Sequence, residues 1–161
     1  MIDRDKVILA AEYFEKAFRL HISGKIKEAI KAYRISVSYL PTAKTYTHLG
    51  WALSMEQKYE EAIEECKNAI ELDPDYGNPY NDIGTYLIAL KKYDEAVYWL
   101  QKALEIKEYS TPYIPLYHLG RVYESKGSFF TALKYYSDSL EHNADFEPAK
   151  TAYFKLIAMM N

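Results

Sequence analysis

The feature that most constrains this chain is an internal repeat with a period of 34 residues. The segment Tyr46–Gly50 and the segment Tyr80–Gly84 both run from an aromatic residue to a glycine, and they lie 34 residues apart. A third segment, Leu116–Gly120, follows 36 residues later, because residues 110–115 carry two extra positions. A period of about 20 to 50 residues indicates stacked copies of one small structural unit.

A fourth, more divergent copy lies before these three. Its residues Tyr13, Ala17, Leu20, Ala29, Tyr33 and Pro41 correspond, at an offset of 33, to Tyr46, Gly50, Leu53, Ala62, Cys66 and Pro74. We therefore expect a single domain over residues 1–161, with repeats at about 10–42, 43–76, 77–112 and 113–146.

Each copy contains two stretches in which apolar residues recur every three to four positions. In the second copy, Tyr46, Leu49 and Leu53 mark the first stretch, and residues 59–70 form the other. This spacing is typical of amphipathic helices, so each copy predicts a helical hairpin. Residues 147–160 have the same spacing once more. A solenoid needs a terminal element over its last repeat, and we predict that this segment is a capping helix.

Small residues recur at fixed places in these predicted hairpins. Gly50, Gly84, Gly120 and Ala17 fall in the middle of first helices, where glycine costs about 1 kcal/mol relative to alanine. A repeated cost implies close helix contact, with Ala29, Ala62, Ala96 and Ala132 as the expected facing residues. Gly24 and Gly127 fall between paired helices, where a left-handed residue often ends a helix.

The pattern resembles the tetratricopeptide repeat family. The second copy reads Tyr46-x2-Leu49-Gly50-x2-Leu53, then Ala62-x3-Cys66, then Pro74, and the third and fourth copies repeat it with Ala96-x3-Leu100 and Ala132-x3-Tyr136. Glu108 and Ala144 depart from it where proline is usual, as does Lys16 where an apolar residue is usual. The resemblance implies an all-α, right-handed superhelical solenoid of helix-turn-helix repeats.

In that family, first helices line a concave groove that binds peptides or protein segments. The resemblance then implies binding residues at the first-helix positions that packing leaves free: Phe14, Phe18, His48, Trp51, Met55, Asn78, Asn81, Asp82, Thr85, Tyr117, His118 and Arg121. Exposed aromatic residues often anchor binding, and asparagine can hold a peptide backbone. The alternative for Phe14 and Phe18 is packing against the core between repeats.

One form of ligand recognition in this family uses a clamp for two carboxylates, built from Lys, Asn, Asn, Lys and Arg. If the groove begins at the first copy, those places hold Phe14, Phe18, His48, Asn78 and Asp82. If it begins at the second, they hold Thr47, Trp51, Asp82, Ile114 and His118. Neither set can pair a terminal carboxylate, so we do not expect the chain to bind chaperone C-terminal tails.

Charge and composition exclude several classes of protein. The chain has 20 basic and 23 acidic residues and a net charge of -3, which argues against nucleic-acid binding. It contains no apolar stretch near the 18 or so residues of a membrane span. Cys66 is its single cysteine, and we interpret it as a core residue. The charged start, Met1–Lys6, is not typical of a secretory signal, so we expect a cytoplasmic protein.

No motif indicates an enzyme, a cofactor or a metal site. The sequence has no phosphate-binding glycine loop, no nucleophile elbow and no Cys-x-x-Cys. His48 and His118 lie two repeats apart, on the order of 20 Å, which is too far to share a zinc ion. They flank Asp82 in the repeat order instead, so their protonation could favour acidic ligands at low pH.

The leading interpretation is a non-enzymatic scaffold or adaptor that binds a protein or peptide of unknown identity. The alternative is a structural module that self-associates, with its groove occupied by a helix of another copy. A weak homo-oligomer would follow from that alternative. The first copy is basic and the second is acidic, which could favour such contacts between molecules.

Overall fold

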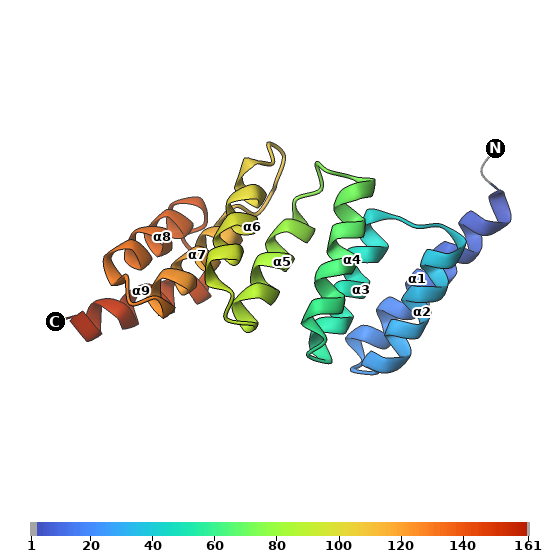
Figure 1. Ribbon diagram of the computed structural model, residues 1–161, viewed down its shortest axis with the longest axis horizontal. Coiled ribbons are helices and arrows are strands. Elements are labelled where there is room, and N and C mark those ends of the chain that lie inside the picture. Colours follow the sequence, from blue (N-terminus) through green and yellow to red (C-terminus); the bar gives the residue numbers. More distant parts are fainter. Residues whose placement is uncertain (1–2, 161) are drawn as a thin grey trace. The chain divides into compact units, whose positions relative to one another are not determined.

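The computed structural model describes residues 3–160, which form nine α-helices and no strand (Figure 1). Met1, Ile2 and Asn161 lie outside the described residues. The helices are α1 (Arg4–Ile22), α2 (Ile26–Tyr39), α3 (Ala43–Met55), α4 (Tyr59–Leu72), α5 (Asn78–Ala89), α6 (Tyr93–Glu105), α7 (Tyr113–Ser125), α8 (Phe129–His142) and α9 (Glu147–Met160). This is the all-α repeat fold that the periodicity predicts.

The chain divides into two compact units, with the boundary between Asp82 and Ile83 inside α5. In the N-terminal unit, α1 packs on α2, α2 on α3, and α3 on α4. In the C-terminal unit, α6 packs on α7, α7 on α8, and α8 on α9. The expected organisation as a single domain of four repeats stays a prediction.

Left-handed residues end the first helix of each hairpin. Gly24 and Gly127 have φ values of 79° and 76°, as their positions predict. The other two turns use Gln57 and Lys91, each with φ of 59°. Sequence reasoning missed this pair, because a residue with a Cβ pays a steric cost in this conformation and gives no compositional signal.

The mid-helix glycines are places of close helix contact, as predicted. A Cβ on Gly50 would lie 3.0 Å from the Ala62 carbonyl oxygen and 3.1 Å from the Cys66 sulfur. A Cβ on Gly84 would lie 2.5 Å from Leu100 Cγ. The predicted facing alanines are therefore only part of the contact. The residue one turn after each alanine lies on the same helix face, and its larger side chain reaches the glycine.

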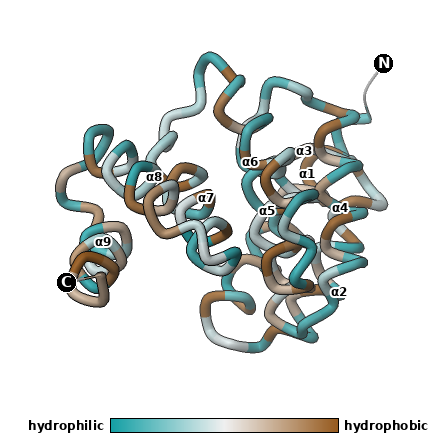
Figure 2. The backbone as a smooth tube through the Cα atoms, turned by 60° about the vertical axis from the view of Figure 1, so that its left-hand side comes forward, coloured by the Kyte–Doolittle hydropathy of each residue, from teal (hydrophilic) through white to brown (hydrophobic). Residues whose placement is uncertain are grey.

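The predicted capping helix is α9, which lies beside α8 (Figure 2). Leu156 is buried with Ala132 and Tyr136 in one cluster. Two other apolar residues of α9, Phe154 and Met159, stay exposed, at 62% and 64%. Among residues 3–160, no helix has the length and apolarity needed to cross a membrane.

Candidate binding surface

Helices α1 and α3 of the N-terminal unit bring predicted binding residues into contact. The Phe14 and Phe18 rings stack with their centroids 6.4 Å apart. The His48 ring meets both edge-on, at 5.1 Å from Phe14 and 5.9 Å from Phe18. The ring centroid of Trp51 lies 6.3 Å from that of His48. Residues spaced three or four apart share a helix face, which is why the sequence could predict this grouping.

His21 of α1 completes this group. Its ring centroid lies 4.2 Å from that of Trp51. Its Nε2 is 3.1 Å from the Met55 sulfur and its Nδ1 is 3.4 Å from the Tyr33 hydroxyl. It lies three residues after Phe18, so both residues share a face of α1. The first-helix cluster comprises the following residues: Phe14, Phe18, His21, His48, Trp51 and Met55.

Both histidines of the first-helix cluster favour the neutral form. Burial lowers the pKa of His21, and the nearby charge of His48 lowers it further. Burial also lowers the pKa of His48, against a smaller opposing effect of its hydrogen bond to the Lys44 carbonyl. In the neutral ring, His48 Nδ1–H donates that bond, at 2.9 Å, so Nε2 remains an acceptor.

The cluster presents apolar surface to solvent. Trp51 is 45% exposed and Met55 is 51% exposed, whereas His21 beneath them is buried. The Lys44 ammonium lies 4.8 Å from the Phe14 ring centroid, so one edge of the cluster is cationic. Phe14 and Phe18 are only half-buried, so core packing does not account for all of their surface. The arrangement suits an apolar side chain of a partner.

The predicted residues of α5 in the N-terminal unit differ in accessibility. Asn78 is exposed, and its amide donates to the Tyr76 hydroxyl at 2.9 Å. Asn81 is only 7% exposed, which leaves little surface for the predicted contact with a peptide backbone. Burial raises the pKa of its neighbour Asp82 to about 7, partly offset by a hydrogen bond from Asn81. The sequence predicted which face of the helix carries these residues, but not how deeply each side chain is buried.

The C-terminal unit places Tyr117, His118 and Arg121 together on α7. The Arg121 guanidinium lies 5.9 Å from the Tyr117 ring centroid, and its Nη1 is 3.5 Å from His118 Nδ1. Burial lowers the pKa of His118 to about 4, and the Arg121 charge adds to this effect. A pKa of about 4 keeps His118 neutral at pH 5.5, so it disfavours the hypothesis that His118 protonation tunes binding at mildly acidic pH. Thr85, also in this unit, is half-buried in α5.

No cluster of metal ligands was found in the part of the chain that the structure describes. Groups of three or more His, Cys, Asp or Glu able to hold an ion do not occur among residues 3–160. The pKa of Cys66 is raised well above its ordinary value, first by burial and then by the nearby Asp82 and Glu65 charges. This thiol is therefore protonated at neutral pH and is a poor nucleophile.

Comparison with known proteins identifies the repeat. Residues 41–108 match the family model for the tetratricopeptide repeat. These residues are tetratricopeptide repeats. The chain is 32% identical over 107 residues to mouse sperm-associated antigen 1, a match that covers 66% of this chain and 12% of that relative.

Solved structures share the fold of this chain. The Pseudomonas aeruginosa pilF structure aligns with 98% of this chain and 71% of its own, with a TM-score of 0.87 and 20% identity. The first tetratricopeptide repeat domain of Spaghetti (RPAP3), bound to the HSP90 peptide SRMEEVD, aligns with 75% of this chain and 95% of its own. Its TM-score is 0.70 at 23% identity. At such identities the likeness concerns the fold alone.

Proposed function

We propose that this chain is a non-enzymatic scaffold or adaptor that binds a peptide or protein segment along its first helices. The first-helix cluster is the anchor point of that surface. The observation that carries the proposal is the exposure of Trp51 and Met55 above a packed, uncharged layer of rings. Aromatic residues with a fixed orientation lose little entropy on binding and are common binding hot spots.

The chemistry of the cluster favours an apolar ligand side chain. Neutral His21 and His48 can be covered by a ligand without the cost of burying a charge. The His48 Nε2 atom can accept a hydrogen bond from the ligand backbone. The Spaghetti domain binds an HSP90 peptide. The clamp positions would hold Phe14, Phe18 and His48 if the groove begins at the first copy, and Thr47, Trp51 and His118 if it begins at the second. Neither set pairs carboxylates, so we propose an apolar segment and not a chaperone C-terminal tail. A cytoplasmic location stays a prediction.

Peptide selection followed by site-directed variants tests this function. A peptide is selected from a random phage-displayed library against the full chain, and its affinity is measured by fluorescence anisotropy. Trp51→Ala should weaken binding about 30-fold, which corresponds to loss of about 2 kcal/mol at a hot spot. Tyr98→Ala is the matched control, since Tyr98 on α6 is 55% exposed. Unchanged affinity in Trp51→Ala would assign binding to another surface.

Self-association is the second candidate function, and two exposed apolar residues of α9 favour it. Phe154 and Met159 form apolar surface on the terminal helix, at the end of the C-terminal unit. Another copy could accept this helix on its first-helix cluster. Light scattering of the full chain should then show a mass that rises with concentration. Phe154→Ser with Met159→Ser should abolish that rise, and a constant monomer mass in wild type would exclude this candidate.

A further inference from the structure

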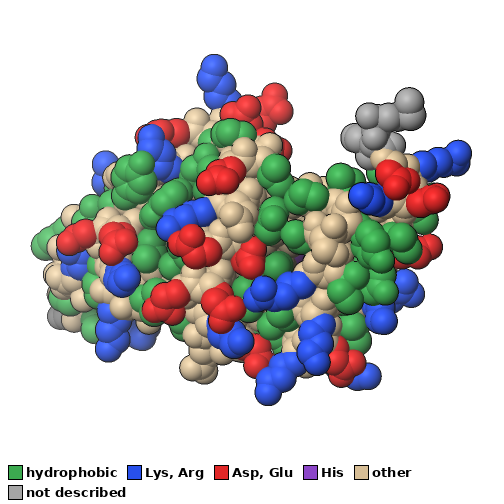
Figure 3. All heavy atoms as spheres, turned by 45° about the vertical axis from the view of Figure 1, so that its right-hand side comes forward, with side chains coloured by type: hydrophobic (Ala, Val, Ile, Leu, Met, Phe, Trp, Pro, Cys, Tyr) green, Lys and Arg blue, Asp and Glu red, His purple; other side chains and the backbone are tan. Residues whose placement is uncertain are grey.

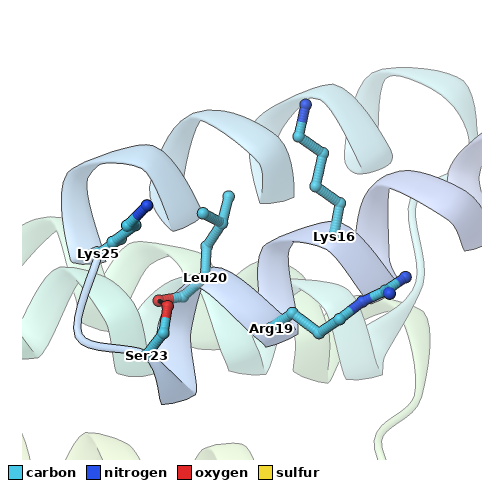
Figure 4. Close-up of a pocket in the computed structure, with 5 residues that line it drawn as sticks. All are labelled: Lys16, Arg19, Leu20, Ser23 and Lys25. Atoms are coloured by element: carbon cyan, nitrogen blue, oxygen red, sulfur yellow. Dashed lines mark hydrogen bonds between the residues drawn. The ribbon is translucent and has the colours of Figure 1, made fainter.

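A hollow lies on the face of α1 opposite the first-helix cluster. It has a volume of about 440 Å³ and is lined by Lys16, Arg19, Leu20, Ser23 and Lys25 (Figure 4). Phe14 and Phe18 are two positions from Lys16 and Leu20, and an offset of two residues turns a helix face by about 200°. The hollow is therefore separate from the surface that we propose for the apolar ligand.

A second hollow extends the first along the same helix. It has a volume of about 260 Å³ and is lined by Leu9, Glu12, Tyr13 and Lys16. Lys16 lines both, so the two hollows follow α1 from Leu9 to Ser23, a length of about 21 Å at 1.5 Å per residue. We call them together the α1 trough. About six residues of extended chain would fit along it.

The positive charges of the α1 trough have no acidic partner among the described residues. Lys16, Arg19 and Lys25 take part in none of the ion pairs found there. Arg19 Nε donates a long bond of 3.4 Å to the Glu15 carbonyl oxygen, and the Lys16 ammonium lies 5.8 Å from the Tyr13 ring centroid. Figure 3 shows that Lys and Arg side chains are otherwise interspersed with Asp and Glu side chains over the visible face of the molecule.

The arrangement of the cations indicates the kind of anion that fits. Lys16 and Lys25 project to the same side of α1, with Leu20 between them, whereas Arg19 extends away (Figure 4). The charges are spread along the α1 trough and do not converge on a point, as a single phosphate would require. Several carboxylates spaced along a chain match them better, and Leu20 offers apolar contact between the charges.

We propose that the α1 trough binds an acidic segment of a partner protein, with carboxylates on Lys16 and Lys25, an apolar side chain on Leu20 between them, and Arg19 adding positive charge at the edge. The partner would thus be held at a second surface, independent of the first-helix cluster. Glu12, at the other end of the trough, disfavours further carboxylates there. The preferred segment therefore has its acidic residues concentrated at one end.

The test uses the full chain and a fluorescein-labelled probe peptide, Glu-Glu-Leu-Glu-Glu-Leu-Ala-Ala. Anisotropy at about 50 mM salt should show binding that weakens as salt rises. The variant Lys16→Glu/Arg19→Glu/Lys25→Glu should lose at least 10-fold in affinity. The matched control is Lys107→Glu/Lys134→Glu/Lys155→Glu, which makes the same change in net charge at exposed positions of the C-terminal unit. This control should keep most of the affinity.

Further arms separate the proposal from its alternatives. Trp51→Ala should leave probe binding unchanged, so failure of the apolar site and failure of the α1 trough are distinguishable. The neutral variant Lys16→Gln/Arg19→Gln/Lys25→Gln, checked by circular dichroism, replaces the glutamate variant if the latter does not fold, and it should also lose affinity. The proposal is overturned by equal losses in trough and control variants, or by no binding in wild type. Full displacement of the probe by millimolar inorganic phosphate, or a dimer that the trough variant abolishes, would also overturn it.

Discussion

The α1–α2 hairpin and the α7–α8 hairpin have the same core contacts at an offset of 103 residues. Ser36 donates a hydrogen bond of 2.7 Å to the Ala10 carbonyl, and Ser139 donates one of 2.7 Å to the Tyr113 carbonyl. The turns agree as well, since Gly24 and Gly127 are both left-handed. The divergent first copy thus shares its local structure with the fourth.

A buried tyrosine occupies the centre of each hairpin. Tyr33 and Tyr136 are both fully buried, and each packs against a ring of the first helix. The ring centroids are 5.8 Å apart for Phe14 with Tyr33 and 5.9 Å apart for Tyr117 with Tyr136. Both hairpins therefore have the same ring packing at their core, although the first-helix ring is Phe14 in one and Tyr117 in the other.

The two hairpins differ in the residue that contacts the tyrosine hydroxyl. In the first hairpin the neutral His21 lies 3.4 Å from the Tyr33 hydroxyl. In the other, Tyr136 donates a hydrogen bond of 2.6 Å to the Glu124 carboxylate. Phe18 is similarly replaced by Arg121. At these two positions α1 carries uncharged residues and α7 carries charged ones, although the two hairpins have the same core packing. The comparison teaches that packing constrains the core residues, whereas the residues on the first-helix face can differ.

The largest expected effect comes from the position where the two hairpins differ by one methyl group. Gly120→Ala should destabilise the protein by about 2 to 3 kcal/mol, because the new Cβ would overlap the Tyr136 ring. The equivalent residue in the first hairpin is already Ala17, and Ala17→Gly should cost only about 1 kcal/mol through helix propensity. Urea unfolding followed by circular dichroism measures both. Equal costs for the two changes would mean that the paired helices are equally far apart in both hairpins.

The tyrosine hydroxyls should rank next. Tyr136→Phe should cost about 2 kcal/mol, because it leaves the Glu124 carboxylate without its donor. Tyr33→Phe should cost about 0.5 kcal/mol, since its longer contact is with a neutral ring. The same unfolding assay applies. Glu124→Gln should reduce the effect of Tyr136→Phe, and the comparison fails if both Tyr→Phe changes cost the same.

The pH dependence of stability should distinguish His118 from its counterpart, the exposed Glu15. The folded protein lowers the pKa of His118 to about 4, so the unfolded chain binds a proton first as pH falls below about 6.5. The stabilising contribution of His118 to the free energy of unfolding is complete above pH 6.5. It is lost progressively as pH falls to about 4 and does not change further below that pH. The full shift would correspond to about 3 kcal/mol, and the partial exposure of His118 reduces the expected size to about 1 to 2 kcal/mol. The difference in unfolding free energy between wild type and His118→Gln, measured from pH 7.5 to 4, should shift by this amount. A difference independent of pH contradicts it.

The smallest effect concerns the turns. Gln57→Gly should stabilise the protein by about 0.5 to 1 kcal/mol, because glycine adopts a φ of 59° without steric cost. The reverse change at an equivalent turn, Gly24→Gln, should destabilise it by a similar amount. Thermal and urea unfolding can both resolve these shifts. If Gln57→Gly lowers stability, interactions of the Gln57 side chain outweigh the backbone strain.

Much of the fold could be predicted from the sequence because its determinants are local and repeated. Helix periodicity, the left-handed Gly24 and the close contact at Gly50 each depend on a few neighbouring residues. The grouping of Phe14, Phe18 and His48 also followed, since register assigns residues to a helix face. These features recur at one offset, so each copy reinforces the prediction from the others.

The rest depends on depth and on charge in three dimensions. Register placed Asn81 on the first-helix face, but packing buries it to 7% exposure. It likewise placed His118 among titrating groups, but burial holds the pKa of that residue near 4. Accessibility and pKa depend on how closely neighbouring elements approach, and no pattern along the chain reports that distance.

The sequence by itself determined the repeat, the helices and the face of each helix on which a residue lies. Tertiary structure decided which residues on a shared face contact one another, as when His21 packs under Trp51 and reaches the Tyr33 hydroxyl. It also decided that Lys16, Arg19 and Lys25 line one trough without acidic partners in the described part of the chain. The physical reason is that periodicity arises from the geometry of a single helix, whereas contacts and unpaired charge arise from the packing of one helix on another.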